Sequence, residues 1–544
     1  MKRFTLSILL CLLLVPARSQ DRLYVATDRQ AYLAGDPVYC SLFCTDENGR
    51  RNGFSAVSYL ELIAADGTVA EAKVALFNGR GAGFFRIPAS TPTGNYRLVA
   101  YTARSQAVPE GSRVLSIYNT YSRARVTDGV RFVPADAYRP FTAPDVQEGV
   151  SLSIPARVQQ DRDVTLVIDG LTQKADLWVS VFHEDGLEQL PAAEGLAGFL
   201  HGQPAGKGDR PGEYEGEIIY ATVEGLVSGD NHSEDQATAI LSTAGSPSHV
   251  YVGRSDEDGR ISFYTGNIFG DRELVCQVSS VLGKQGYIDL ASPFTHPEVP
   301  AADPLVLSPA QQGALVSRKA ALRTESTQLD TLVRFLPKRE DLLLDGITPV
   351  HYHLDDYNRF PSVREMCIEF ISMLQFSRVN GEWLLRMAVT DGVESRHYLQ
   401  DHILVMMDGV VLPDHAVLAD FDAMLLDDVY IYQQAVALGG VIYNGVVNFV
   451  SKKNYVTALP FPDNVRVVDF KGVSYPVACP GGVGGTGKDL RQLLYWNPAL
   501  EVDENAALRI PIHTPAYPGR FRAHVEGWLE DGTPVKASYC FDVE

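Results

Sequence analysis

The chain has 544 residues and a formal net charge of −20 at pH 7, from 67 acidic side chains against 47 lysines and arginines. An acidic chain gains nothing from displacing counterions along a nucleic-acid backbone, so no DNA or RNA partner is expected. Single hydrophobic cores stop growing near roughly 250 to 300 residues, so the length indicates several domains. The frequent Val, Tyr and Phe, broken by turn dipeptides, favour a mainly β chain.

The N-terminus has the pattern of a secretory signal peptide. Lys2 and Arg3 precede an apolar run, and Ala17 and Ser19 form the small-x-small pattern that signal peptidase reads. We therefore place a signal peptide over 1–19 and expect an exported protein. The apolar run is too short to cross a bilayer, and no later apolar stretch approaches about 18 residues, so no transmembrane segment is expected after cleavage.

Residues 20–128 are predicted to form an immunoglobulin-like β-sandwich. The run from Val38 to Cys44 has two largely apolar faces, as in a strand flanked by packed layers. The stretch also contains a set of characteristic residues: Thr27, Asp28, Tyr32, Gly35, Val38, Gly94, Tyr96 and Leu98. Through these residues it resembles the MG2 domain of the α2-macroglobulin superfamily. No cysteine lies in the C-x-E-Q thioester context that the protease trapping of that family requires, so this activity is not expected.

Residues 145–212 and 213–290 are predicted to form two further sandwiches. The first holds three short strand patterns and a Gly- and Ala-rich insertion, and is expected to be a second macroglobulin-like sandwich. The second has spaced strands around an Asp-rich turn. It resembles the carboxypeptidase-regulatory-like domain, through Asp256, Asp258, Gly259, Arg260 and Phe263.

Residues 305–340 are predicted to form a connecting helix, with Ser308 as its N-cap and Pro309 in its first turn. Leucines recur every seven residues, which suggests a zipper, but the other seam positions are charged or polar. An amphipathic helix docked on its own domain is therefore favoured over a coiled coil. The repeating leucines are Leu315, Leu322, Leu329 and Leu336.

Residues 348–455 change to an α/β pattern. Ser362 can cap a helix, and the Asp408-Gly409 dipeptide suits a two-residue hairpin turn. The order of the elements, which closes on an Asn-Gly-Val strand at 444–448, resembles the plug domain of TonB-dependent outer-membrane receptors. The resemblance implies a folded α/β module that in those receptors sits within a barrel.

Two departures from that family bear on function. Gln433 and Gln434 stand where these receptors usually carry an Arg-Gly pair, and only 90 residues follow Asn454, too few for the strands of a transmembrane barrel. We therefore expect a plug fold that gates no pore within this chain and that serves another use or docks on a separate protein. The candidate interface consists of Asp408, Gly409, Gln433, Gln434, Asn444 and Gly445.

The tail, residues 490–544, alternates polar and apolar residues between turns and is expected to be a C-terminal β-sandwich. The whole arrangement resembles exported Bacteroides-type proteins that combine macroglobulin-like, regulatory-like and plug-like domains in one chain. The predicted fold is therefore mainly β, with several immunoglobulin-like β-sandwich domains in series and one α/β plug-like domain.

Cysteine spacing argues against a metal centre. Cys40 and Cys44 lie four residues apart in one predicted strand, which separates their Cα atoms by about 13 Å, beyond the roughly 7 Å that a disulfide spans. No C-x-x-C or Cys/His zinc spacing occurs, so neither a structural metal nor a cofactor is expected. A long-range disulfide stays open among Cys40, Cys44, Cys276, Cys367, Cys479 and Cys540.

Four short motifs invite chemical interpretations that their surroundings do not support. His183 lacks the second His of a zinc protease, and Arg254 takes the first ligand position of a calcium loop, so a hairpin turn is favoured there. A glycine-rich run at P-loop spacing ends in Asp489, an acid that would repel phosphates. His351 and His353 lack a third metal ligand. No catalytic, cofactor-binding or metal-binding residue is therefore predicted.

These observations together favour a non-enzymatic cell-envelope protein that acts through protein–protein interaction. We expect it in the periplasm, at the outer membrane or at the cell surface, with its plug-like domain docked on an outer-membrane transport or secretion complex. The alternative is a surface receptor that binds a glycan or peptide through a β-sandwich face. A hydrolase is a third hypothesis, because catalytic triads are defined by geometry and not by sequence order.

Overall fold

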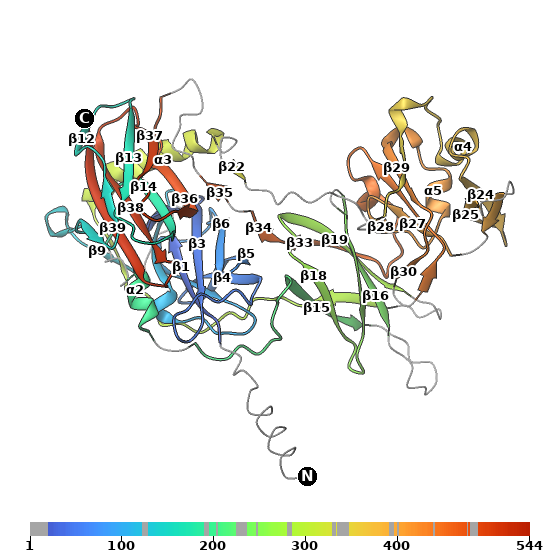
Figure 1. Ribbon diagram of the computed structural model, residues 1–544, viewed down its shortest axis with the longest axis horizontal. Helices are drawn as coiled ribbons and strands as arrows, with labels where there is room; N and C mark the ends of the chain where they lie inside the picture. The colour runs from blue at the N-terminus through green and yellow to red at the C-terminus, as the bar shows by residue number, and fades with distance from the viewer. Residues whose placement is uncertain are drawn as a thin grey trace, which may run out of the picture. The chain divides into compact units, whose positions relative to one another are not determined.

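The computed structural model is mainly β, as predicted (Figure 1). It divides into two compact units: unit 1 comprises Met1–Gly216, Phe294–Leu336 and Val473–Glu544, and unit 2 comprises Glu217–Pro293 and Pro337–Gly472. The predicted signal peptide, 1–19, lies outside the described residues. These are 20–121, 129–189, 195–202, 205–224, 237–245, 248–279, 286–328, 333–334, 347–390, 396–399, 402–438, 441–475, 477–478 and 488–544.

Unit 1 begins with a β-sandwich whose strands follow the order β1-β3-β6-β5-β4-β7-β8-β2. Strand β5 pairs with both β4 and β6 and so belongs to both halves, while the short β34 pairs with β5 in parallel. The strands are β1 (Arg22–Thr27), β2 (Ala31–Leu33), β3 (Pro37–Thr45), β4 (Val57–Ala64), β5 (Gly67–Phe77), β6 (Arg80–Arg86), β7 (Gly94–Tyr101), β8 (Arg113–Tyr118) and β34 (Val473–Ser474).

Strand β3 uses both of its predicted apolar faces. Leu42 and Cys44 are fully buried in the core of this sandwich. Tyr39 and Phe43 point to the other face and join a second apolar cluster, in which the Phe43 and Trp528 rings meet edge to face at 4.7 Å. The outer face of the first sandwich is therefore covered by another layer of the same unit.

That layer is a second sandwich built from two segments far apart in the chain. Strand β14 pairs with β36 on one side and with β38 on the other, so residues of the predicted 145–212 and 490–544 domains share one sheet. The prediction of two separate sandwiches is wrong, because neither segment has enough strands to close a core alone. The strands are β10 (Val146–Glu148), β11 (Ser151–Ser153), β12 (Arg157–Val158), β13 (Asp163–Asp169), β14 (Ala175–His183), β36 (Leu493–Val502), β37 (Leu508–His513), β38 (Gly519–Leu529) and β39 (Pro534–Val543).

The predicted connecting helix docks on its own unit, but the predicted bounds 305–340 are wrong, because Leu305–Leu307 and Val333–Arg334 form strands. A 3-10 turn, η3 (Pro309–Gln311), is capped by Ser308 and leads into α3 (Gln312–Gln328). Arg318 of α3 forms a buried ion pair with Asp185 and donates to the carbonyl of Ala31. Leu329 and Leu336 of the suggested zipper lie outside the described residues. The smaller elements of unit 1 are η1 (Pro109–Gly111), β9 (Val130–Phe132), η2 (Ala135–Ala137), α2 (Gly195–Leu200), β21 (Leu305–Leu307), β22 (Val333–Arg334) and β35 (Val477–Ala478).

Unit 2 contains a β-sandwich over the segment predicted as regulatory-like. The predicted turn is present: Gly259 has a φ of 77° and its N–H donates to the carbonyl of Asp256. The sheets have the orders β18-β15-β20 and β17-β16-β19-β33. Their strands are β15 (Glu217–Glu224), β16 (Thr238–Thr243), β17 (Val250–Arg254), β18 (Arg260–Gly266), β19 (Asp271–Ser279), β20 (Tyr287–Leu290) and β33 (Arg466–Lys471).

The remainder of unit 2 has the predicted α/β pattern, with a sheet of order β23-β29-β32-β27-β28. Ser362 caps α4 by accepting from the N–H of Glu365. Its elements are β23 (Val350–His353), η5 (Leu354–Asp356), α4 (Val363–Glu369), β24 (Leu374–Val379), β25 (Glu382–Thr390), β26 (Arg396–Leu399), β27 (Leu404–Met407), β28 (Val410–Val411), α5 (Ala416–Ala419), η6 (Ala423–Leu425), β29 (Leu426–Tyr432), β30 (Val436–Leu438), β31 (Val441–Tyr443), β32 (Val446–Ser451) and η7 (Tyr455–Ala458).

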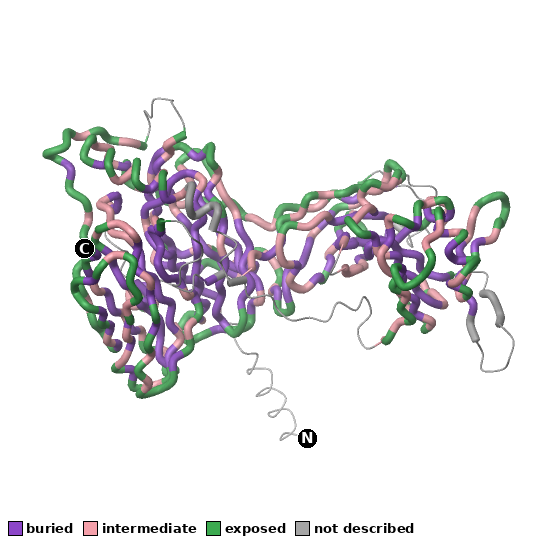
Figure 2. Tube along the Cα trace, turned by 90° about the horizontal axis from the view of Figure 1, so that it is seen from above, coloured by how far each residue is buried: buried purple, intermediate pink, exposed green. Residues whose placement is uncertain are grey.

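Burial follows the strands within each unit (Figure 2). The five cysteines in the described part of the chain, Cys40, Cys44, Cys276, Cys367 and Cys540, are free thiols. Within the described residues, no helix combines the length and apolar character needed to cross a membrane.

Candidate functional site

The predicted Asp408-Gly409 turn is present but buried. Both residues have left-handed backbone, with φ of 48° and 79°, as a two-residue hairpin turn requires. The Asp408 carboxylate accepts from the N–H and the hydroxyl of Ser451, each at 2.6 Å, and from the N–H of Val456 at 3.2 Å. A Cβ at Gly409 would lie 2.0 Å from that of Ser248. These two residues hold unit 2 together and offer no surface to a partner.

The other residues of the candidate interface differ in exposure. Gly445 is buried, Gln433 and Asn444 are half-buried, and Gln434 is exposed. Strand β31, between them, presents Ile442 with 66% of its surface exposed. The interface stays a prediction, and only its Gln434 edge is fully open to a partner.

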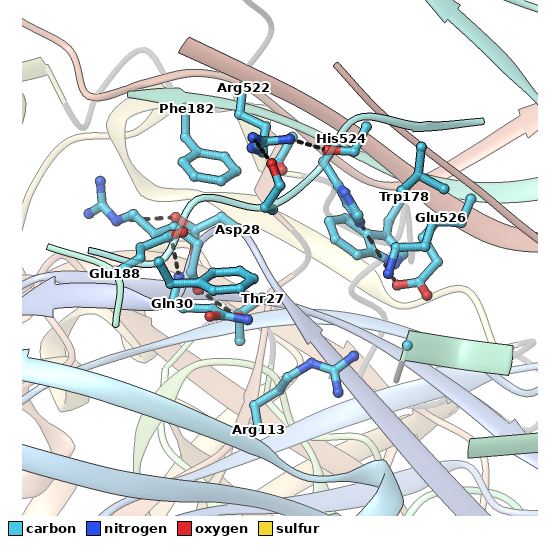
Figure 3. A pocket seen from close by; sticks show the side chains of 18 of the residues that line it. Thr27, Asp28, Gln30, Arg113, Trp178, Phe182, Glu188, Arg522, His524 and Glu526 are labelled. Atoms are coloured by element: carbon cyan, nitrogen blue, oxygen red, sulfur yellow. Dashed lines mark hydrogen bonds and ion pairs between the residues drawn. The ribbon is translucent and has the colours of Figure 1, made fainter. Parts of the chain in front are cut away.

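A cavity that the sequence did not predict lies in unit 1, between the two sandwiches. Its volume is about 310 Å³. Figure 3 shows side chains that line it. Alternate residues of β14 share one face, and the antiparallel register places Trp178 opposite Glu526 and Ser180 opposite His524 of β38. This face packs against the outer face of the first sandwich, which contributes Tyr24 of β1. Trp178 and Phe182 on this face, and Leu177, Val179 and Val181 on the other, are large apolar residues, a signal that both faces would be covered.

Glu526 lines one wall of the cavity and connects neighbouring elements through its carboxylate. It is buried, and its carboxylate accepts from the Tyr24 hydroxyl at 2.8 Å and from the N–H of Leu196 at 2.7 Å. Burial alone would raise the pKa of Glu526, but contact with His524 and the positive charges of Lys536 and Arg113 lower it to about 2. Glu526 is therefore ionised and fully satisfied at neutral pH.

Two other carboxyl groups on the walls are held differently. Asp28 accepts from the Tyr32 hydroxyl at 2.8 Å through Oδ1, while burial raises its pKa to about 6. Glu188 accepts from the N–H of Gln30 at 3.3 Å, and burial raises its pKa to about 7. Unlike Glu526, these groups change charge close to neutral pH.

Several buried polar atoms on the cavity walls lack a hydrogen-bond partner within the described protein. They are the indole Nε1 of Trp178 and the hydroxyl of Ser180. Oδ2 of Asp28 also accepts no hydrogen bond, but it forms an ion pair with Arg29, whose Nε lies 3.6 Å away. Buried polar groups are almost always hydrogen-bonded, so such atoms call for water or a ligand. The cavity therefore offers donors, an acceptor and aromatic walls, the composition typical of a binding pocket.

The cavity does not have the geometry of a hydrolase. Ser180 and His524 are neighbours across two strands, but the Ser180 hydroxyl makes no hydrogen bond to the imidazole. The Glu526 carboxylate lies 4.0 Å from His524 Nε2 and is already held by Tyr24 and Leu196. A nucleophile, a base and an orienting acid in hydrogen-bonded sequence are the signature of this chemistry, and these three residues do not form it.

The remaining motifs have structural roles. His351 and His353 both contact Oδ1 of Asp428, at 2.8 and 2.9 Å. His183 Nδ1 lies 2.9 Å from the side-chain oxygen of Gln492, at the end of β14. Asp489 pairs with Arg491 at 2.7 Å, whereas the glycine-rich run before it, 481–487, lies outside the described residues.

No protein-family model and no curated protein matches the sequence. Among solved structures, the chain is similar to native Escherichia coli α2-macroglobulin, with 8% identity over 97% of this chain and 40% of that one, and a TM-score of 0.25. It is also similar to Salmonella α2-macroglobulin reacted with methylamine, with 10% identity over 96% and 39% of the two chains, and a TM-score of 0.25. Dimeric latent PorU from Porphyromonas gingivalis follows, with 11% identity over 50% and 34%, and a TM-score of 0.18.

The chain thus spans about two fifths of the length of these α2-macroglobulins. Such low TM-scores carry no conclusion about activity. The sandwich architecture rests instead on the strand pairing and the buried cores of the chain itself.

Proposed function

We propose that this chain is a non-enzymatic cell-envelope protein that binds a protein partner by taking a short peptide segment into the unit 1 cavity. The observation that carries the proposal is the pair of buried, unpartnered donors, Trp178 Nε1 and Ser180 Oγ, on the walls of a cavity of about 310 Å³. The expected export signal over 1–19 supports an envelope location.

A peptide matches this cavity in chemistry. Its carbonyl groups accept hydrogen bonds, as the Trp178 and Ser180 donors require. Its N–H groups can donate to Oδ2 of Asp28, which accepts no hydrogen bond and pairs with Arg29 Nε at 3.6 Å. The rings of Tyr24 and Phe182 provide an apolar wall for a side chain. An extended segment would satisfy the buried polar atoms and bury an apolar anchor together.

The test is peptide binding by the full mature chain and by a Trp178→Phe variant, which removes the indole N–H. Peptides selected from a random library on the wild-type protein are expected to bind the variant about tenfold more weakly, the equivalent of one hydrogen bond. Trp496→Phe is the matched control, because Trp496 also has a buried, unpartnered Nε1 but does not line the cavity.

The same variants decide between a peptide and a glycan. Binding of glycans on an array, weakened by Trp178→Phe while no peptide binds, would favour the receptor alternative. If neither class binds, or if Trp178→Phe and Trp496→Phe have equal effects, the cavity is not the binding site.

A second candidate function is docking of unit 2 on an outer-membrane complex. The observation that favours it is the exposed Ile442 on β31, close in sequence to the exposed Gln434 and to Asn444. A photo-crosslinking residue at 434 or 442 is expected to capture an outer-membrane barrel protein in intact envelopes. The same residue at 264 is the control, since Tyr264 is 75% exposed elsewhere in unit 2. Equal capture from all three positions would contradict specific docking.

A further inference from the structure

The outer face of strands β4 and β5 carries two glutamates that stand directly opposite each other. The antiparallel register pairs Glu61 with Glu71. Like charges in directly opposed positions destabilise a sheet. Glu61 is also fully buried, so its charge needs compensation from close by. Lys73, two residues along β5 on the same face, supplies one positive charge.

A returning segment, residues 294–304, covers this face. The ring of Phe294 meets Tyr59 edge to face at 5.7 Å, and the N–H of Thr295 donates to the hydroxyl of Tyr101 at 2.8 Å. Further along, Arg97 donates to the carbonyl of Pro300 at 3.1 Å. The segment is thereby held against the sheet on both sides of His296.

His296 brings an imidazole to the two carboxylates. Its Nδ1 lies 2.9 Å from Oε2 of Glu61 and 3.7 Å from Oε1 of Glu71. One ligand atom from each of the three residues falls within 4.8 Å of the others. A tetrahedral zinc with ligand distances of about 2.0 to 2.2 Å separates its ligand atoms by roughly 3.3 to 3.6 Å, so the observed triangle needs only small shifts to hold an ion.

We propose that Glu61, Glu71 and His296 form a binding site for a divalent transition-metal ion of the zinc class, with solvent completing its coordination. One imidazole and two carboxylates form a mixed nitrogen and oxygen set, which suits zinc better than calcium, a cation that prefers oxygen ligands alone. His296 leaves 56% of its side chain exposed, so an ion can enter from solvent.

Groups around the site orient its ligands as an outer shell does in metal centres. Tyr101 donates to Oε1 of Glu61 at 2.5 Å. The hydroxyl of Thr68 lies 2.7 Å from Oε2 of Glu61 and 3.2 Å from Nδ1 of His296, so it contacts two of the proposed ligands. These hydrogen bonds hold the carboxylate of Glu61 in place. Only the side chains of Glu71 and His296 then need to move when an ion binds. A bound ion would link the returning segment, through His296, to strands β4 and β5 of the first sandwich.

The experiment is titration of zinc alone into the chelator-treated mature chain, followed by calorimetry and by thermal unfolding. We expect one zinc per chain, a raised unfolding temperature, and slower protease cleavage within 294–304. His296→Ala should weaken zinc binding at least tenfold. Glu71→Gln, a change at a partly exposed position that leaves the buried Glu61 intact, should do the same while the circular dichroism spectrum shows a folded protein.

The chain offers a matched control in His513. It also contacts two carboxylates, but through opposite ring nitrogens: Nδ1 lies 2.9 Å from Asp163 and Nε2 lies 3.2 Å from Asp161. No single ion can reach all three of those groups, so His513→Ala should leave zinc binding unchanged. The proposal is overturned if zinc does not bind, or if it binds the His296→Ala and Glu71→Gln variants as tightly as the wild type. In either outcome, His296 and Glu61 form an ion pair only.

Discussion

Replacement of Glu188 by Gln tests the electrostatics of the unit 1 cavity. Glu188 is buried with 8% of its surface exposed, and it accepts a long hydrogen bond, 3.3 Å, from the N–H of Gln30. The positive charge of Arg318 lowers the pKa of Glu188, but this guanidinium is already engaged by Asp185. Glutamine keeps the acceptor oxygen for Gln30 and removes the charge.

The magnitude follows from the pKa of Glu188, which burial raises from 4.5 to about 7 in the folded protein. The folded state therefore binds this proton more tightly than the unfolded state, and the free energy of unfolding falls as pH rises from 4.5 to 7. A displacement of this size corresponds to about 3 kcal/mol lost above pH 7. The Glu188→Gln variant should be about 2 to 3 kcal/mol more stable than the wild type at pH 8 and equal to it at pH 4.5.

Urea unfolding at a series of pH values measures this difference. Tryptophan fluorescence reports mainly on unit 1, which contains Trp178, Trp496 and Trp528, three of the four tryptophans. Glu148→Gln, at an exposed position of β10, is the control and should change stability by less than about 0.5 kcal/mol at any pH. An equal effect of Glu188→Gln at pH 5 and pH 8, or a loss of stability at pH 8, would refute the reasoning.

Three further predictions concern single buried groups. Asp408→Ala removes the acceptor of three hydrogen bonds and should destabilise unit 2 by about 3 to 5 kcal/mol in urea unfolding. Asp408→Asn should cost about half as much, and Asp414→Asn, on the surface, should be nearly neutral. An Asp408→Ala variant as stable as the wild type would contradict a structural role of this turn. Arg318→Met leaves Asp185 buried without its partner and should lower the stability of unit 1 by about 3 to 5 kcal/mol. The double variant Arg318→Met with Asp185→Leu removes both charges and should recover most of that stability. The pKa of Glu526 is lowered to about 2, so its ionisation contributes about 3 kcal/mol to the free energy of unfolding above pH 4.5. This contribution is lost as the pH falls from 4.5 to 2. In the Glu526→Gln variant, the free energy of unfolding should therefore fall less steeply over this pH range, and an unchanged slope would contradict the prediction.

The local features of this chain were readable in its sequence. The Asp408-Gly409 turn, the Ser362 cap and the turn at Gly259 are present as predicted, because capping and turn chemistry act within a few residues. The two apolar faces of β3 correctly indicated that the strand is covered on both sides. What these patterns could not state is which layer covers the outer face.

The candidate sites depended on contacts between distant residues. The cavity joins Tyr24, Trp178 and Glu526, and the proposed metal site joins Glu61, Glu71 and His296. No spacing rule connects residues so far apart, and the sequence accordingly predicted no metal. The burial of the Asp408-Gly409 turn was not readable for a related reason. A turn dipeptide has the same sequence whether its turn faces solvent or is packed against another loop, as Gly409 is against Ser248.

The sequence by itself determined the mainly β character, the Ser308 and Ser362 helix caps, the hairpin turns and the α/β change after residue 348. Only the tertiary structure decided that β14 lies between β36 and β38, so that residues of two predicted domains form one sandwich. The physical reason is that alternation specifies which face of a strand is apolar but not which partner buries it. The choice of partner strand depends on how all the apolar faces of the chain can be buried from water at the same time.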